Sequence, residues 1–213
     1  MKNTIIFILI AFCFIQMTNG NAQILAGSAK IPIDPFTAGL KVQLGGYGER
    51  AGKPAEGVHD TTYAKGLVLH QPKSNDYLFI ITMDVCHVPW SVVSHTVKKA
   101  NLPFLTENNL LIMASHTHAG LEGMSMDERN VLNNPHIGIF DPQMLDFVSS
   151  KLAELVKEAL KELQPVTFSS KVIEVKGLNK NRRDINLPTD TTLNILRFDK
   201  NGSPWIVFVN FTA

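Results

Sequence analysis

Two continuous apolar segments restrict the fold of this chain more than any other feature. The stretches "YLFIITMDV" at 77–85 and "NLLIMAS" at 109–115 are expected of strands that are covered on both faces. Between them, Pro89 can open a short helix that runs to about residue 100. A strand–helix–strand unit of this kind predicts two neighbouring parallel strands whose carboxyl ends open on the same crevice.

The remaining secondary structure indicates a sheet that is not entirely parallel. A helix is predicted from the N-cap Asp141 and the first-turn residue Pro142 to about Leu163. Asn201-Gly202 is typical of a turn between two hairpin strands. The other predicted strands are 24–33, 61–71, 166–175, 191–198 and 205–212. We therefore predict an α/β fold with mixed β-sheets and flanking helices.

The N-terminus has the pattern of a secretory signal peptide over residues 1–22. Lys2 precedes a long apolar run, and the small residues Gly20 and Ala22 occupy the −3 and −1 positions of a cleavage site. The pattern predicts export to the periplasm or the medium, with an uncleaved anchor as the alternative. The remaining residues, 23–213, are predicted to form one domain.

Composition excludes some classes of partner and of covalent structure. The formal net charge is +1 over 213 residues, and no basic face is evident, so a nucleic-acid partner is not expected. Cleavage of the signal peptide would leave Cys86 as the single cysteine, which cannot form an internal disulfide. Because Cys86 follows an apolar strand, a buried, inert thiol is favoured over a nucleophile.

The segment "LIMASHTHAG" at 111–120 contains two histidines, His116 and His118, at the end of a predicted strand. On an extended backbone, residues two apart point to the same side, so both imidazoles could face one point. Imidazole is a common zinc ligand, but two loop histidines without any ligand are an equally good interpretation. Two histidines are also not a complete site, because a catalytic zinc normally has three protein ligands.

Other polar residues lie at comparable places in the predicted fold. Asp84 ends one buried strand as His116 ends the next, so the two could share a crevice. His59 closes a glycine-rich loop, and "NKNRR" at 179–183 lies between apolar strands. Each also has an ordinary explanation: a helix cap for Asp84, a solvated loop for His59, and surface arginines for the third cluster.

Taken together and in order, these stretches resemble the N-terminal catalytic domain of neutral/alkaline (non-lysosomal) ceramidases. The resemblance rests on "GGYGERAGKPAEGVHDTTYAKGLVL", "LIMASHTHAG" and "GLNKNRRD", and it covers nearly all of the chain after the signal peptide. It implies a zinc-dependent amidohydrolase, with Zn²⁺ as cofactor. Such an enzyme cleaves the N-acyl bond of ceramide, or of a related lipid amide, to a fatty acid and a sphingoid base.

The resemblance also implies roles for individual residues. The first histidine of the family's T-H-T-H motif is a zinc ligand, which corresponds to His116. The second lines the catalytic centre, which corresponds to His118. The family's N-x-N-R segment matches Asn179, Asn181 and Arg182, and implies a catalytic arginine that faces the substrate, with Asn181 in substrate binding.

The chain departs from the family pattern in two respects. The family commonly reads T-H-T-H-S-G-P, whereas this chain has Ser115 before the histidine pair and Leu121 in place of the proline. Because the loop after the histidine pair differs from the family pattern, the sequence does not determine which substrate is bound. The remaining zinc ligands implied by the resemblance would follow Ala213, so we expect a partial catalytic domain that is inactive by itself.

Two alternatives to a ceramide hydrolase follow from the sequence. One is an exported, non-catalytic module of the same fold that binds lipid or glycan. The other is a metal hydrolase that acts on a different amide or ester. A ceramide-like substrate would also be compatible with peripheral membrane contact, and the oligomeric state is left open.

Overall fold

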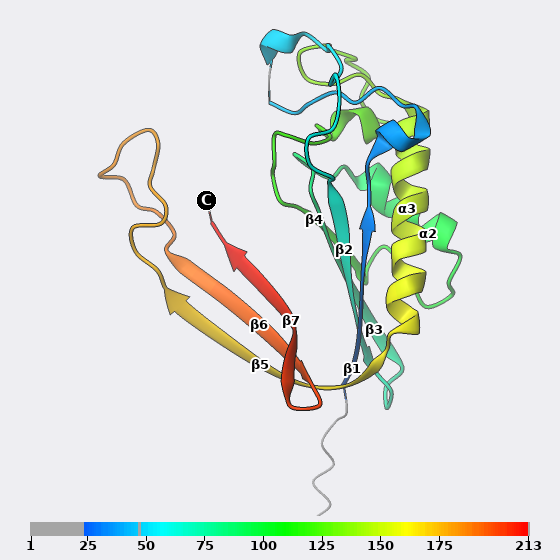
Figure 1. The fold of residues 1–213 in the computed structure, drawn as a ribbon, viewed down its shortest axis with the longest axis vertical. Coiled ribbons are helices and arrows are strands. Elements are labelled where there is room, and N and C mark those ends of the chain that lie inside the picture. Colours follow the sequence, from blue (N-terminus) through cyan, green and yellow to red (C-terminus); the bar gives the residue numbers. More distant parts are fainter. Residues whose placement is uncertain (1–23, 47, 213) are drawn as a thin grey trace, which may run out of the picture.

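The computed structural model describes residues 24–46 and 48–212, so the predicted signal peptide lies outside the described residues. The described chain contains a seven-stranded sheet in the order β4-β3-β2-β1-β5-β6-β7 (Figure 1). The strands are β1 (Ile24–Pro32), β2 (Tyr63–Gln71), β3 (Asp76–Met83), β4 (Leu110–Ala114), β5 (Gln164–Glu174), β6 (Thr192–Lys200) and β7 (Ser203–Phe211). The helices are α2 (Trp90–Ala100) and α3 (Pro142–Lys161), with short 3-10 turns η1 (Pro35–Ala38), η2 (Gly48–Arg50) and η3 (Met124–Met126).

One pair of neighbouring strands is parallel, and it is the pair predicted from the two apolar segments. β3 and β4 run in parallel register from Phe79 opposite Leu110 to Met83 opposite Ala114. The other neighbouring strands of the sheet are antiparallel. The predicted mixed α/β fold is therefore confirmed.

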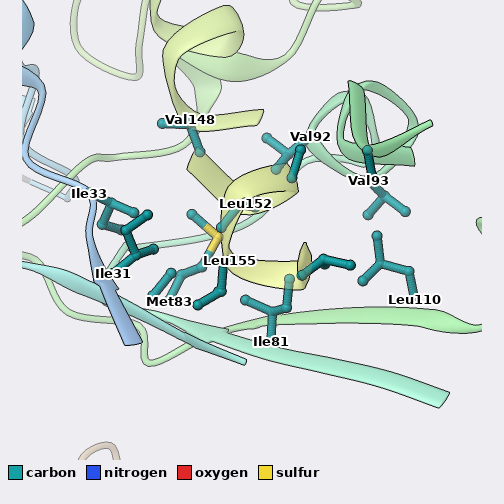
Figure 2. Close-up of a cluster of buried hydrophobic side chains, with 14 of the residues drawn as sticks. Ile31, Ile33, Ile81, Met83, Val92, Val93, Leu110, Val148, Leu152 and Leu155 are labelled. Atoms are coloured by element: carbon teal, nitrogen blue, oxygen red, sulfur yellow. The ribbon is translucent and has the colours of Figure 1, made fainter. Parts of the chain in front are cut away.

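Helices α2 and α3 cover one face of β1–β4, and the main core lies between these helices and the sheet (Figures 1 and 2). The α3 helix begins as predicted, because the Asp141 side chain accepts hydrogen bonds from the backbone N–H groups of Gln143 and Met144. Its buried side packs against the alternate strand residues that face the helices. These core residues are Ile31, Ile81, Met83, Val148, Leu152 and Leu155.

A glycine lets the end of α3 lie directly on the sheet. A Cβ atom at Gly27 of β1 would collide with the backbone of Ala159 on the helix. Only a residue without a side chain permits this approach. Within the described ranges, no helix has the length and apolar character needed to cross a bilayer.

The last three strands leave the plane of the first four (Figure 1). β5 pairs with β1 only over Ile24–Ala26, and then continues with β6 and β7 as a separate antiparallel ribbon. Phe198 of β6 is 3% exposed and belongs to a second cluster with Ala26, Leu67 and Ile80. Because these strand residues alternate with those of the main core, this cluster covers the sheet face opposite the helices.

We predict that Leu152→Ala lowers the free energy of unfolding by about 2–5 kcal/mol, because Leu152 is fully buried between α3 and the sheet. Urea denaturation measures the change. Lys157→Ala on the exposed side of the same helix is the control and should change stability by less than about 0.5 kcal/mol. Equal effects of the two substitutions would contradict the packing described here.

Candidate metal centre and adjoining cleft

His116 and His118 lie in the loop that follows β4. The N–H of Ser115 still donates to the carbonyl of Met83 at 2.9 Å, which extends the β3–β4 pairing to the start of the loop. His116 then adopts a left-handed conformation with φ 59°, so the extended backbone expected for this pair is wrong. The turn nevertheless brings the two rings together edge to face, with centroids 4.9 Å apart.

Backbone carbonyls orient both imidazoles. Nδ1 of His116 lies 2.7 Å from the carbonyl oxygen of Cys86, and Nδ1 of His118 lies 2.8 Å from that of Gly45. A carbonyl can only accept, so Nδ1 carries the hydrogen in both rings, and Nε2 is the acceptor nitrogen of the neutral imidazole. Ligating histidines in metal sites are commonly fixed in this way.

The glycine pair of the "GGYG" stretch is required by this arrangement. Gly46 has φ 77°, and a Cβ atom there would overlap the His118 ring. A Cβ atom on Gly45 would crowd the side chain of Cys86. The glycines therefore allow the 44–46 segment to approach both the thiol and the histidine.

Cys86 completes a cluster of possible metal ligands. One possible ligand atom from each of Cys86, His116 and His118 fits within a 4.8 Å group. Thiolate sulfur and imidazole nitrogen are both zinc ligands, so this donor set would fit part of a zinc site once Cys86 has lost its proton. Burial, and secondly the charge of Glu122, raises the pKa of the Cys86 thiol. The predicted burial of Cys86 is confirmed, and its low reactivity stays a prediction.

Glu122 is a buried carboxylate near this cluster that the sequence analysis missed. It is 2% exposed, accepts a hydrogen bond from the N–H of Ser125 at 2.6 Å, and also accepts from the N–H of Met124. Burial raises the pKa of Glu122, although these hydrogen bonds act in the opposite direction. The carboxylate thereby shapes the loop that follows His118.

A cleft of about 680 Å³ brings three of the four predicted site residues together. His116 forms one wall, and Asn181 and Arg182 come from the loop between β5 and β6. The amide nitrogen of Asn179 holds this loop in place, since it donates to the carbonyls of Asp190 at 2.6 Å and Thr212 at 3.0 Å. His118 is stacked edge-on against His116, but it is not among the residues that line the cleft.

The other two polar positions considered from the sequence do not join the histidine cluster. The Asp84 carboxylate accepts from the N–H of Tyr63 at 3.0 Å, which ties β2 to the end of β3. His59 pairs with Asp60 at 2.8 Å, and both side chains are largely exposed at a separate pocket. Asp84 is therefore held in a structural role, and His59 faces a different cavity from His116.

Comparison with known proteins identifies the family. Residues 35–212 match the family described as "Neutral/alkaline non-lysosomal ceramidase, N-terminal". The chain belongs to this family. A search of the curated proteins found no match.

Two solved structures share the fold. The structure described as "Ceramidase complexed with C2" is 21% identical with a TM-score of 0.72, and the match covers 89% of this chain and 31% of that one. The neutral ceramidase from Pseudomonas aeruginosa is 22% identical with a TM-score of 0.70, covering 86% of this chain and 31% of that one. The ceramidase-family chain described here thus spans about 31% of the length of these structures.

We predict that Gly46→Ala costs at least about 1 kcal/mol more stability than Gly39→Ala. Both glycines have positive φ, so both alanines pay backbone strain, but a Cβ atom at Gly39 meets nothing within 4 Å. Only the substitution at Gly46 should also shift the imidazole nitrogen resonances of His118 in NMR spectra. If the two variants unfold at equal free energies and leave His118 unperturbed, the close approach of Gly46 to this ring is wrong.

Proposed function

We propose that this ceramidase-family protein hydrolyses the N-acyl bond of ceramide or a related lipid amide, with Zn²⁺ held in part by His116. The observation that supports the proposal most directly is the shared cleft of His116 and Arg182. It brings a histidine of fixed tautomer and an arginine from a distant loop to one cavity, in a chain of the ceramidase family. Export of the protein, through the predicted signal peptide at 1–22, is part of the same proposal.

His116 would contribute Nε2 to the metal, because its Nδ1–H is engaged with the carbonyl of Cys86. When bound, zinc lowers the pKa of a coordinated water and polarises an amide carbonyl. Because His118 is assigned to proton transfer below, His116 and at most the buried Cys86 remain as ligands among the described residues, which is fewer than the three protein ligands that a catalytic zinc needs. For that reason residues 23–213 alone are expected to bind zinc weakly and to lack activity.

His118 is proposed to move a proton in the reaction. Its Nδ1–H is anchored on the carbonyl of Gly45, so the ring cannot rotate without losing that hydrogen bond. Nε2 can then accept a proton as a base and return it as an acid, which is the usual role of a positioned histidine. The edge-to-face contact keeps the His118 ring next to His116, which lines the cleft.

Arg182 is proposed to stabilise negative charge on the amide oxygen of the substrate. Its exposed guanidinium lines the cleft, and five N–H donors can serve a developing oxyanion. Asn181 lines the same cleft, and its side-chain oxygen accepts from the N–H of Arg183 at 3.0 Å, which fixes the turn that carries Arg182. The Asn179 side-chain oxygen is buried without a partner among the described residues, which leaves an acceptor for a polar ligand.

We predict that His116→Ala in the complete protein lowers the zinc content by at least about half, because a first ligand is lost. Metal analysis of purified protein measures the change. His70→Ala is the control, since His70 stacks on Tyr77 and is absent from the histidine cluster. An unchanged zinc content in His116→Ala would exclude this residue as a ligand.

We predict that Arg182→Ala lowers kcat/KM on a ceramide-type substrate about a hundredfold or more, with little change in thermal stability. The adjacent Arg183→Ala is a matched control, because Arg183 is also exposed but does not line the cleft. Steady-state kinetics on N-acyl sphingosine, alongside short N-acyl amino acids, tests the role and the substrate class together. Near-normal kinetics for Arg182→Ala would refute its assigned role.

A further inference from the structure

We infer that residues 129–140, here called the apolar loop, form a docking surface for a lipid bilayer that contains anionic lipid. The loop exposes four aliphatic side chains, those of Val131, Leu132, Ile137 and Ile139. Val131 and Leu132 are 85% and 77% exposed, which leaves almost all of their apolar surface in water. Such side chains gain free energy when they move from water into an apolar phase.

Hydrogen bonds across the apolar loop keep it ordered. The side-chain nitrogen of Asn130 donates to the carbonyl of Gly138 at 2.9 Å, and the side-chain oxygen of Asn133 accepts from the N–H of Phe140 at 3.1 Å. These bonds bring the two halves of the loop, and so their aliphatic side chains, next to each other. The base of the loop packs on the buried Glu122, because a Cβ atom at Gly138 would collide with that carboxylate.

Backbone N–H groups in the second half of the loop already have acceptors within the protein. The N–H groups of Ile137 and Gly138 both donate to the carbonyl of Asn134, at 2.9 and 2.8 Å. The N–H of Ile139 donates to the side-chain oxygen of Gln43 at 3.0 Å. An unbonded N–H group is costly in an apolar phase, so these bonds lower the cost of placing the loop among lipids.

A turn with basic side chains packs against the apolar loop. A Cβ atom at Gly52 would lie 3.1 Å from the side chain of Pro135, so the turn and the loop touch. Arg50 donates to the carbonyl of Pro54 at 2.9 Å, which holds the turn closed, and Lys53 is exposed. Two cationic residues therefore lie next to the aliphatic ones.

The charges around the loop favour an anionic surface over a neutral one. Lys41 adds a third cation, because it lines a cavity that the loop also lines. Glu49 opposes one of these three charges. Asp127 and Glu128 precede the loop, and each is paired with an arginine or histidine side chain. Basic residues beside inserted apolar ones are the usual composition of a surface that binds anionic lipid.

A bilayer suits this surface better than a folded protein partner does. A protein surface would cover only one side of Val131 and Leu132, whereas lipid can surround an inserted side chain. The four exposed side chains are aliphatic, and they include none of the tryptophan, tyrosine or arginine anchors that dominate protein interfaces. The loop thus offers a protruding apolar tip and not a shaped contact face.

Docking through the apolar loop would also orient the candidate site. In Figure 1 the loop and η2 lie at the end of the sheet where β3 and β4 lead into the segments that carry Cys86 and His116. That end would then face the bilayer in which a lipid substrate resides. Binding to lipid is nevertheless a separate claim from hydrolysis, because it requires no reaction.

The experiment measures co-sedimentation of the complete protein with phosphatidylcholine vesicles, with and without phosphatidylglycerol, in the absence of any lipid amide. The wild type should bind the mixed vesicles more tightly than the neutral ones. Leu132→Ser should weaken binding to the mixed vesicles about tenfold, because its side chain no longer gains from leaving water. Leu78→Ser is the matched control, because Leu78 is also exposed but lies near the opposite end of β3, and it should leave binding unchanged.

A second pair of variants tests the charges. Lys53→Gln should weaken binding to the mixed vesicles about fivefold and leave binding to neutral vesicles unchanged. High salt should remove the difference between Lys53→Gln and the wild type, because it screens exposed charges. Lys73→Gln, in the exposed turn between β2 and β3, is the control and should bind as the wild type does.

Equal vesicle binding by Leu132→Ser and Leu78→Ser would overturn the inference, as would a wild type that does not bind the mixed vesicles. Conversion of a dimer to a monomer by Leu132→Ser, with vesicle binding unchanged, would assign the loop to a second copy of the chain instead. A larger loss of thermal stability in Leu132→Ser than in Leu78→Ser would place the loop inside the complete protein and also overturn the inference. Vesicle binding as expected without hydrolysis of any lipid amide would refute only the proposed function.

Discussion

The parallel pairing of β3 with β4 brings the loops that follow both strands to one end of the sheet. Cys86 follows β3 and His116 follows β4, and the carbonyl of the first accepts a hydrogen bond from the ring of the second. The N–H of Cys86 also donates to the carbonyl of Leu121 at 2.8 Å, which closes the far end of the histidine loop. In an antiparallel pair, the five-residue β4 would carry His116 about 16 Å away, to the opposite end of the strands.

The orientation of the histidines depends on main-chain acceptors. The carbonyls of Gly45 and Cys86 hold the two Nδ1–H groups, so the side chain at 86 can change without loss of an acceptor. The residue at 46 has no such freedom, because its missing side chain makes room for the His118 ring. This accounts for the glycine-rich stretch in physical terms: it supplies space as well as a turn.

Local patterns in the sequence were sufficient for most of the fold. The two apolar strands, the Asp141 cap and the Asn201-Gly202 turn each depend on neighbouring residues, and each is found where predicted. The left-handed turn at His116 and the approach of Gly46 depend on contacts distant in sequence, which no local pattern reports. Glu122 was missed for the same reason, since its burial follows from how the loop closes over it.

The cleft depends on packing that lies far from the histidines. Arg182 and His116 line one cleft because the β5–β7 ribbon folds back over the sheet. Strand pairing between β5 and β1 holds this ribbon to the sheet over three residue pairs. Phe198, the buried residue of β6, supports the ribbon from within the cluster that contains Ala26, Leu67 and Ile80, and partly buried ribbon residues such as Leu196 and Trp205 pack against the same cluster. Hydrogen bonds from Asn179 then fix the loop to the end of the ribbon. The separation of His116 from Arg182 thus depends on a small hydrophobic cluster and one asparagine. Changes in packing there can alter the cleft without any change in the residues that line it.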